Sequence, residues 1–117
     1  MVHGALELQT FHPQIHITVL RAIGRIDAET APRFLDACRA ALDSGHLVAN
    51  LAGVTFLSSS GVGALLVLLE SARELCRELS VAPASPEVTS ALESLNLGQT
   101  LQILDSEAEA LARLRAA

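Results

Sequence analysis

The most constraining feature of the sequence is a run near its middle that is apolar on both faces. Leu47–Leu51 reads Leu-Val-Ala-Asn-Leu and has the length of a strand. A strand with apolar side chains pointing both ways is typical of the centre of a largely parallel sheet, where helices cover both faces. We therefore expect an α/β fold with this strand inside it.

The first part of the chain alternates apolar and polar residues with the period of two that strands show. Leu6–Phe11 is one such run, and Ile15–Val19 is a second. His12-Pro13-Gln14 lies between them and predicts the turn of a hairpin. This hairpin would supply an antiparallel edge to the sheet.

Two long helices are expected, one on each side of the central strand in the sequence. The first carries an apolar stripe from Ala31 to Leu42. Asp27 or Thr30 is its expected N-cap, and Gly45 suits a left-handed stop. The second helix is expected from Gly61 to about Glu78.

The rest of the chain repeats the alternation of strand and helix. Ser80–Ala82 and Leu101–Leu104 read as strands, and the helix between them opens at Ser85-Pro86-Glu87 and ends at Gly98. A capping box at Ser106 opens a closing helix. The order β-β-α-β-α-β-α-β-α predicts a mixed, mostly parallel sheet of about five strands with four helices, in a single domain over residues 1–117.

Charge and hydropathy narrow the classes of partner. Thirteen acidic and eight basic residues give a net charge of -5, and the basic residues, all arginine, are scattered along the chain. No basic stripe exists to hold a phosphate backbone, so we expect no direct nucleic-acid binding. The apolar run Val62–Leu69 is far shorter than the roughly 20 residues of a membrane-spanning helix, and the N-terminus lacks the features of a signal peptide. We expect a cytoplasmic protein without contact to a membrane.

Neither a metal nor a cofactor is expected. The cysteines form no Cys-x-x-Cys pair, and the four histidines stand apart in strand and loop sequence. Cys38 and Cys76 fall on the apolar stripes of the two long helices. We expect both to be buried free thiols.

Catalysis is not expected either. A serine nucleophile needs a general base and an orienting partner, and no such set is visible. Residues 58–62 read Ser-Ser-Ser-Gly-Val, which does not fit the G-x-S-x-G elbow of acyl-transfer enzymes. The sequence contains no lysine, which excludes a P-loop and Schiff-base chemistry.

Three serines, Ser58–Ser60, come directly before the second long helix, and two interpretations of them stay open. In the first, Ser59 or Ser60 is only a helix N-cap that satisfies a free backbone N–H group. In the second, a phosphate on Ser60 is received by those N–H groups and by the positive end of the helix dipole. Such a phosphate adds about -1.5 to -2 charges, which can abolish a protein contact without rearranging the fold.

The residues after the serines indicate a surface that another protein can approach. Gly61 and Gly63 leave it without side-chain bulk, so a nucleotide-bearing site of another protein would come close. Val62 and Leu66 lie beside the main apolar stripe of the helix. They form either a docking patch or contacts to a neighbouring helix or loop.

Three segments of the chain, in this order, resemble the signature of STAS domains of the anti-sigma factor antagonist type. They are Gly24-Arg25-Ile26-Asp27, the strand with Asn50-Leu51, and the run from Gly53 to Leu66 with the three serines inside it. The resemblance spans almost the whole chain and implies the STAS fold.

The resemblance also implies a function and a set of site residues. In that family the serine directly before the glycine accepts a phosphate, which is Ser60 here, with Ser59 and Ser58 as competing acceptors. The unphosphorylated antagonist binds an anti-sigma factor, which is typically also its serine kinase, and a phosphatase of the PP2C type resets the switch. The partner-binding residues implied are Arg25, Asp27, Ser58, Ser59, Gly61, Val62, Gly63 and Leu66.

The sequence departs from the family's pattern at two positions. Ser58 stands where the motif has a leading aspartate, and Asn50 stands where the strand has its closing aspartate. We expect both changes to remove a carboxylate near the acceptor, which would lower the efficiency of phosphorylation and leave Ser58 or Ser59 as competing acceptors. A STAS scaffold or a transporter-associated STAS subunit, which binds a partner without a phosphorylation cycle, is therefore the alternative function.

Overall fold

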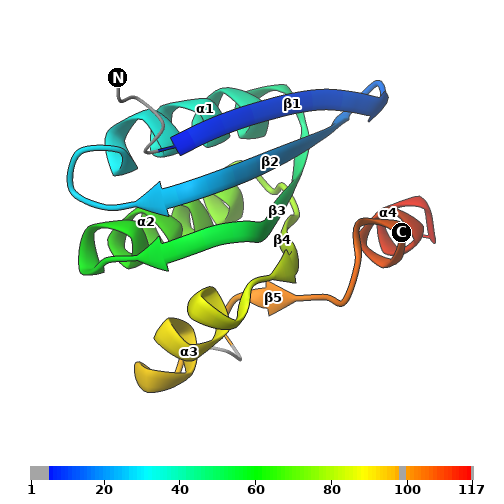
Figure 1. The fold of residues 1–117 in the computed structure, drawn as a ribbon. Coiled ribbons are helices and arrows are strands. Elements are labelled where there is room, and N and C mark those ends of the chain that lie inside the picture. Colours follow the sequence, from blue (N-terminus) through cyan, green and yellow to red (C-terminus); the bar gives the residue numbers. More distant parts are fainter. Residues whose placement is uncertain (1–5, 98–99, 117) are drawn as a thin grey trace.

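The computed structural model describes residues 6–97 and 100–116 of the chain. The elements are β1 (Leu6–Gln14), β2 (Ile17–Ile26), α1 (Ala31–Ser44), β3 (His46–Leu57), α2 (Ser59–Glu74), β4 (Leu79–Ala84), α3 (Pro86–Ser94), β5 (Gln102–Ile103) and α4 (Glu107–Ala116). The strands form one sheet in the order β1-β2-β3-β4-β5, in which β1 pairs antiparallel with β2 and the other pairs are parallel (Figure 1). The predicted order of elements, the antiparallel edge and the α/β class are confirmed.

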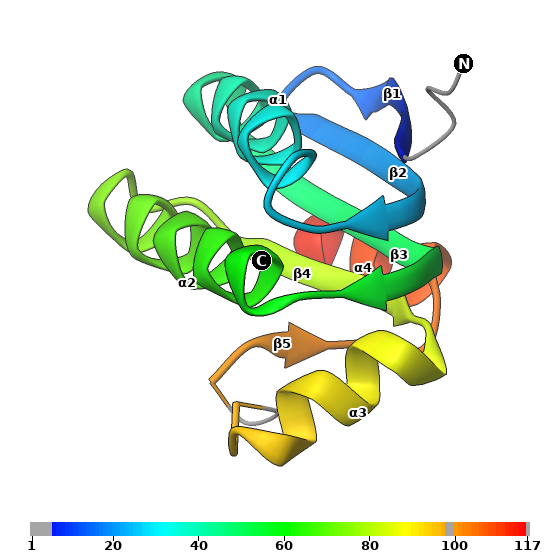
Figure 2. The same ribbon diagram turned by 60° about the vertical axis from the view of Figure 1, so that its left-hand side comes forward.

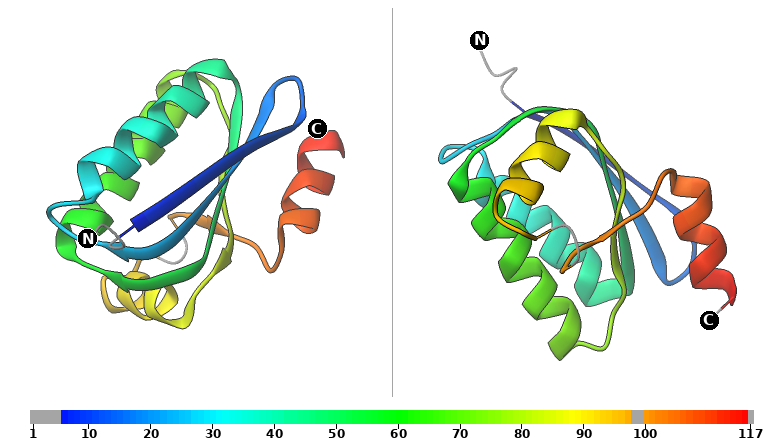
Figure 3. Two further views of the ribbon diagram at one scale, coloured as in Figure 1. Left: turned by 45° about the horizontal axis from the view of Figure 1, so that its top comes forward. Right: turned by 90° about the horizontal axis from the view of Figure 1, so that it is seen from below.

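Helices cover both faces of the sheet, as the apolar central strand predicts. α1 and α2 lie side by side on one face with α3 next to them, and α4 lies on the opposite face (Figures 2 and 3). The larger core, between the sheet and the first three helices, contains the fully buried Leu20, Phe34 and Leu51. A smaller cluster joins α4 to the sheet; it consists of Val19, Val48, Ala82 and Ala110.

The hairpin turns two residues later than predicted. The turn is at Ile15 and His16, and not at His12-Pro13-Gln14. Pairing shifts between Phe11 and Gln14, so Pro13 lies at an irregularity of the edge strand, where its missing N–H costs no ladder bond. Ile15, expected on the apolar side of a strand, is instead 87% exposed.

α1 begins where predicted but ends for a different reason. Thr30 is the N-cap residue, but its side chain makes no capping hydrogen bond; Oδ1 of Asp27 instead accepts the N–H groups of Glu29 and Thr30. A proline stands in the first turn of the helix. Gly45 has φ 164 and is extended, so the expected left-handed stop is wrong. A Cβ on Gly45 would lie 2.2 Å from the carbonyl oxygen of His16, so close backbone approach explains the glycine.

α2 ends at Glu74, one turn before the predicted end. Cys76 has φ 57, a left-handed conformation that breaks the helix and leaves its side chain exposed. The prediction of a buried thiol is therefore wrong for Cys76. It is confirmed for Cys38, where burial raises the pKa of the thiol to about 12. Gly98, the expected end of the third helix, lies outside the described residues.

Two further findings concern membrane-spanning helices and metal-binding groups among the described residues. No helix among them is both long enough and apolar enough to cross a membrane. Residues 6–97 and 100–116 also contain no group of three histidine, cysteine, aspartate or glutamate side chains placed to hold a metal ion.

Candidate functional site

The serine run begins α2, and its first member is the N-cap. Ser58 has an extended backbone (φ -82, ψ 175), and its Oγ accepts the N–H of Gly61 at 3.3 Å. Its carbonyl accepts the N–H of Val62 at 2.9 Å. The expectation that Ser59 or Ser60 caps the helix is therefore wrong. Serine and aspartate are equally good N-caps, so Ser58 keeps the structural role of an aspartate while lacking its charge.

Ser59 and Ser60 occupy the first turn of α2, and both side chains are exposed. Their backbone N–H groups donate to no acceptor within residues 6–97 and 100–116. An exposed hydroxyl here lies beside unpaired N–H groups and the positive end of the helix dipole. The first turn of α2 is thus suited to a negatively charged group, as the second interpretation of the serines requires.

The two glycines after the serines, Gly61 and Gly63, have different surroundings. Gly61 is buried, and a Cβ on it would lie 2.5 Å from Cδ1 of Leu57 and 2.9 Å from Cγ2 of Ile26. Its missing side chain lets α2 approach the end of β2, so it does not contribute the open surface expected of it. Gly63 is half-buried, and a Cβ there would meet nothing within 4 Å.

The expected docking patch of Val62 and Leu66 is divided. Val62 is 6% exposed and belongs to the core, so its side chain is covered and is not a surface contact. Leu66 is 39% exposed, and its neighbour Val67 is 41% exposed. The exposed apolar edge of α2 is therefore formed by Leu66 and Val67, of which the sequence pattern indicated only the first.

A groove of about 320 Å³ runs between α1 and α2, with Ser60 at its edge. We call it the α1–α2 groove; its lining residues are Ala28, Ala31, Pro32, Leu35, Asp36, Ser60, Ala64 and Val67. Apart from Ser60 and Asp36, these side chains are apolar. Sequence reasoning missed the groove because residues from two helices form it, and only the placement of these helices side by side brings them together (Figure 2).

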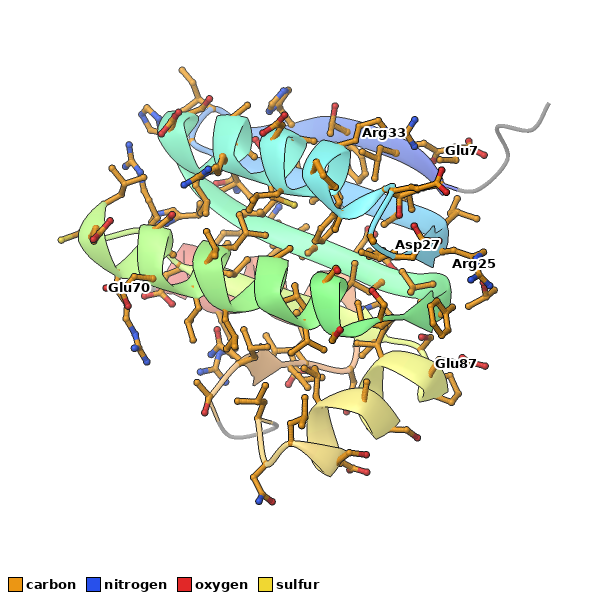
Figure 4. The ribbon with its side chains drawn as sticks, turned by 90° about the vertical axis from the view of Figure 1, so that its left-hand side faces the viewer. Glu7, Arg25, Asp27, Arg33, Glu70 and Glu87 are labelled. Atoms are coloured by element: carbon orange, nitrogen blue, oxygen red, sulfur yellow. The ribbon has the colours of Figure 1, made fainter. Side chains whose placement is uncertain are left out.

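Arg25 and Asp27 lie at the same end of the sheet as the serines. The N–H of Ser58 donates to the carbonyl of Ile26 at 2.9 Å, which joins the start of α2 to the end of β2. Arg25 stacks on the ring of Phe56 at 4.5 Å from its centroid, and its Nε is 3.6 Å from Oδ2 of Asp27 (Figure 4). The structure thus gathers most of the predicted site residues at one end of the molecule and adds Phe56, which is 40% exposed.

The carboxylate of Asp27 is held by the turn that opens α1. Its Oδ1 accepts the N–H of Thr30 at 3.2 Å and the N–H of Glu29 at 3.0 Å. The hydrogen bond from Thr30, followed by that from Glu29 and by the charge of Arg25, lowers the pKa of Asp27 below its ordinary value. Asp27 is therefore a charged group near Ser58 in spite of the missing aspartate in the serine motif.

Asn50 lies far from the serines. β3 continues to Leu57, and its stretch from Asn50 to Leu57 pairs with Arg21–Ile26 of β2, whose five steps at ~3.3 Å per residue span about 17 Å. The expectation that Asn50 removes a carboxylate near the acceptor is therefore wrong. Its Nδ2 instead donates to Oε2 of Glu107 on α4 at 2.6 Å, and Arg21 donates to the same carboxylate from Nε at 2.8 Å and Nη2 at 2.9 Å. An aspartate at position 50 would place its carboxylate next to that of Glu107, and the two negative charges would repel each other.

We predict that replacement of Glu107 with glutamine lowers the melting temperature by a few degrees at neutral pH, because the new amide nitrogen faces the donors of Arg21 and Asn50. The hydrogen bond from Arg21, then that from Asn50, holds the pKa of Glu107 below its ordinary value of 4.5. This stabilisation is present above pH 4.5 and is lost as the pH falls through the lower pKa of the folded state. The difference in melting temperature between wild type and variant should therefore shrink on acidification from pH 4.5 downward.

Thermal unfolding followed by circular dichroism from pH 7 to pH 3 tests this, with the exposed Glu70→Gln as a control whose melting temperature follows that of the wild type. A Glu107→Gln variant with wild-type stability at pH 7 would show that the contacts of Glu107 with Arg21 and Asn50 contribute nothing.

Comparisons with known proteins agree with this geometry. A model of the STAS domain matches residues 10–110. An anti-sigma factor antagonist from Mycobacterium paratuberculosis has a similar structure, with a TM-score of 0.82 and 25% identity over 97% of each chain. The anti-sigma factor antagonist SpoIIAA in its unphosphorylated form has a TM-score of 0.80 and 21% identity, over 95% of this chain and 98% of that one. The phosphorylated form of SpoIIAA from Bacillus has a TM-score of 0.72 and 20% identity, over 92% of this chain and 99% of that one.

Proposed function

The chain belongs to the STAS domain family, and from this premise we propose that it is an anti-sigma factor antagonist that phosphorylation of Ser60 switches off. In this proposal the unphosphorylated protein binds an anti-sigma factor, which is also the serine kinase. Phosphate on Ser60 releases the complex, and a phosphatase of the PP2C type restores binding. The chain acts as one STAS domain in the cytoplasm, without catalysis or a cofactor of its own.

The observation that carries the proposal is the position of Ser60. Its hydroxyl is exposed on the first turn of α2, beside a free backbone N–H group and at the edge of the α1–α2 groove. A phosphate there is favoured by the helix dipole and needs no rearrangement of the core. The same fold occurs in a phosphorylated protein, SpoIIAA, which supports a modification that acts on the surface.

The geometry also favours Ser60 over Ser58 as the acceptor. The Oγ of Ser58 is half-buried and already accepts the N–H of Gly61, so its phosphorylation would sacrifice the N-cap. Ser59 is exposed but does not line the α1–α2 groove, so a phosphate on it would lie outside the hollow that a partner can enter.

The alternative is a STAS scaffold or transporter-associated subunit that binds its partner without a phosphorylation cycle. Ser58 in place of the family's aspartate favours it, because no carboxylate in the motif is then present to orient the hydroxyl of Ser60 or to attract a cation from the kinase. Asp27, whose neighbour Ile26 accepts the N–H of Ser58, is the carboxylate that would take over this task.

Incubation with the cognate anti-sigma factor and ATP, followed by mass spectrometry, separates the two functions. We expect one phosphate, on Ser60, in the wild type and none in Ser60→Ala, which should still bind the anti-sigma factor. Binding of the wild type without any phosphate at Ser60 would contradict the switch and support the scaffold. A phosphate on Ser59 alone would contradict the assignment of the acceptor.

A further inference from the structure

Starting from the proposed function, we propose that the α1–α2 groove receives one large apolar side chain of the anti-sigma factor, with a cationic side chain next to it that pairs with Asp36. The exposed serines and the loop of Asp27 then form only one part of the interface. The groove is a second contact, and it defines the chemistry of the partner segment.

The shape and lining of the groove suit an apolar side chain. Ala31 and Ala64 are nearly buried and form a shallow floor of small residues, while Leu35 and the 41% exposed Val67 supply larger apolar surface. A volume of about 320 Å³ lies at the lower end of the range of ligand pockets. Interfaces gain most of their affinity from a few such anchors in desolvated pockets.

Asp36 lines the groove from the side of α1. α1 and α2 both return from parallel strands and run in the same direction, so Asp36 lies one turn beyond Pro32 while Val67 lies two turns beyond Ser60. The four residues from Pro32 to Asp36 correspond to about 6 Å along the axis of α1. Asp36 is exposed and forms no ion pair with any residue in the described ranges. A free carboxylate in the wall of an apolar groove is complementary to an apolar residue followed by arginine or lysine.

This arrangement explains how a phosphate on Ser60 would release the partner. The apolar side chain would have to be seated against a phosphate stripped of water, and burying an unpaired charge costs more free energy than an exposed ion pair returns. The phosphate therefore excludes the apolar anchor even though it attracts the cation.

A larger side chain at one of the residues that line the groove tests the proposal, because it would occupy the space meant for the partner. Ala28 is exposed and lines the groove near Ser60. We expect Ala28→Leu to weaken binding of the cognate anti-sigma factor about ten- to hundredfold, the loss expected when one apolar side chain is kept out of its pocket. Its matched control is Ala40→Leu, an exposed alanine on α1 that does not line the groove. Calorimetric titration should give the control the affinity of the wild type.

The charge is tested separately. Asp36→Asn should weaken binding about threefold at low salt, and this difference should vanish at high salt, as for an exposed ion pair. Asp105→Asn, which removes an exposed charge between β5 and α4, is the control and should bind as the wild type does. Unchanged affinities for both Ala28→Leu and Asp36→Asn would overturn the groove proposal while leaving the proposed function intact.

If the wild type binds no anti-sigma factor, the proposed function fails. A separate experiment then tests whether the groove binds an apolar side chain followed by a cationic one. The probe is then the peptide acetyl-Leu-Leu-Arg-amide, titrated into isotopically labelled protein and followed by NMR. Shifts of the backbone signals of Ala31, Leu35 and Ala64 in the wild type but not in Ala28→Leu support the groove. Their absence in the wild type overturns it.

Discussion

Replacing Gly45 with alanine should destabilise the protein by about 3 kcal/mol, the upper end of the range for overpacking a filled site. The new Cβ would lie 2.2 Å from the carbonyl oxygen and 2.7 Å from the carbonyl carbon of His16. Both are backbone atoms, and the same oxygen accepts the N–H of His46 at 2.8 Å at the start of β3. No side chain can move aside there, so the hairpin and β3 would have to separate.

A series of glycine-to-alanine variants makes this prediction specific. Gly61→Ala should cost about 2 kcal/mol, less than Gly45→Ala, because its closest clash is with the mobile Cδ1 of Leu57. Gly63→Ala should stabilise by about 0.5 to 1 kcal/mol, because its Cβ would meet nothing and alanine favours the helix. Urea unfolding of the three variants measures the order. A Gly45→Ala protein that unfolds at the same urea concentration as the wild type would contradict the contact.

The sequence predicts the layers of the fold because the pattern of apolar residues shows whether a strand is covered on one face or on both. The run of Leu47–Leu51 requires cover on both sides, and the sheet places it in the central strand β3 between α1 and α2 on one face and α4 on the other. The apolar pattern does not predict that this strand continues beyond Leu51 to Leu57. Pairing of β2 with β3 shifts between Arg21 and Ile23 and again after Gly24, and these shifts hide the regular alternation of a strand.

The strand's unpredicted length explains the error about Asn50. A strand that ends at Leu51 would place Asn50 beside the serines, whereas a strand that continues to Leu57 places it near α4. Its partner, Glu107, is 57 residues away in the sequence, and no local pattern connects the two.

The candidate site at the start of α2 was predictable in its place along the chain, but its geometry was not. Three consecutive serines are equally good N-caps by residue type, and the bond from Ser58 N–H to the Ile26 carbonyl selects the first. Neither the burial of Val62 nor the α1–α2 groove follows from the helical stripe alone, because both depend on the way in which α2 packs against its neighbours.

Replacing Ser60 with glutamate should weaken binding of the anti-sigma factor by about a hundredfold, equivalent to roughly 2.7 kcal/mol. The carboxylate would lie in the lining of the α1–α2 groove, where, on the groove proposal, a bound partner would cover it and remove its water. The stability of the fold should not decrease. A negative charge in the first turn of a helix is favourable by about 0.3 to 1 kcal/mol, so the melting temperature should stay constant or rise slightly.

Ser59→Glu is the control that separates position from charge. It adds the same carboxylate to the same exposed helical turn and gains the same dipole energy, but Ser59 does not line the groove. Calorimetric titration should show at most a fewfold loss of affinity for Ser59→Glu beside the large loss for Ser60→Glu. Equal losses would mean that the partner responds to the total charge of the turn. Equal affinities for Ser60→Glu and the wild type would mean that charge at Ser60 has no effect on the partner, and the phosphorylation switch would lose its physical basis.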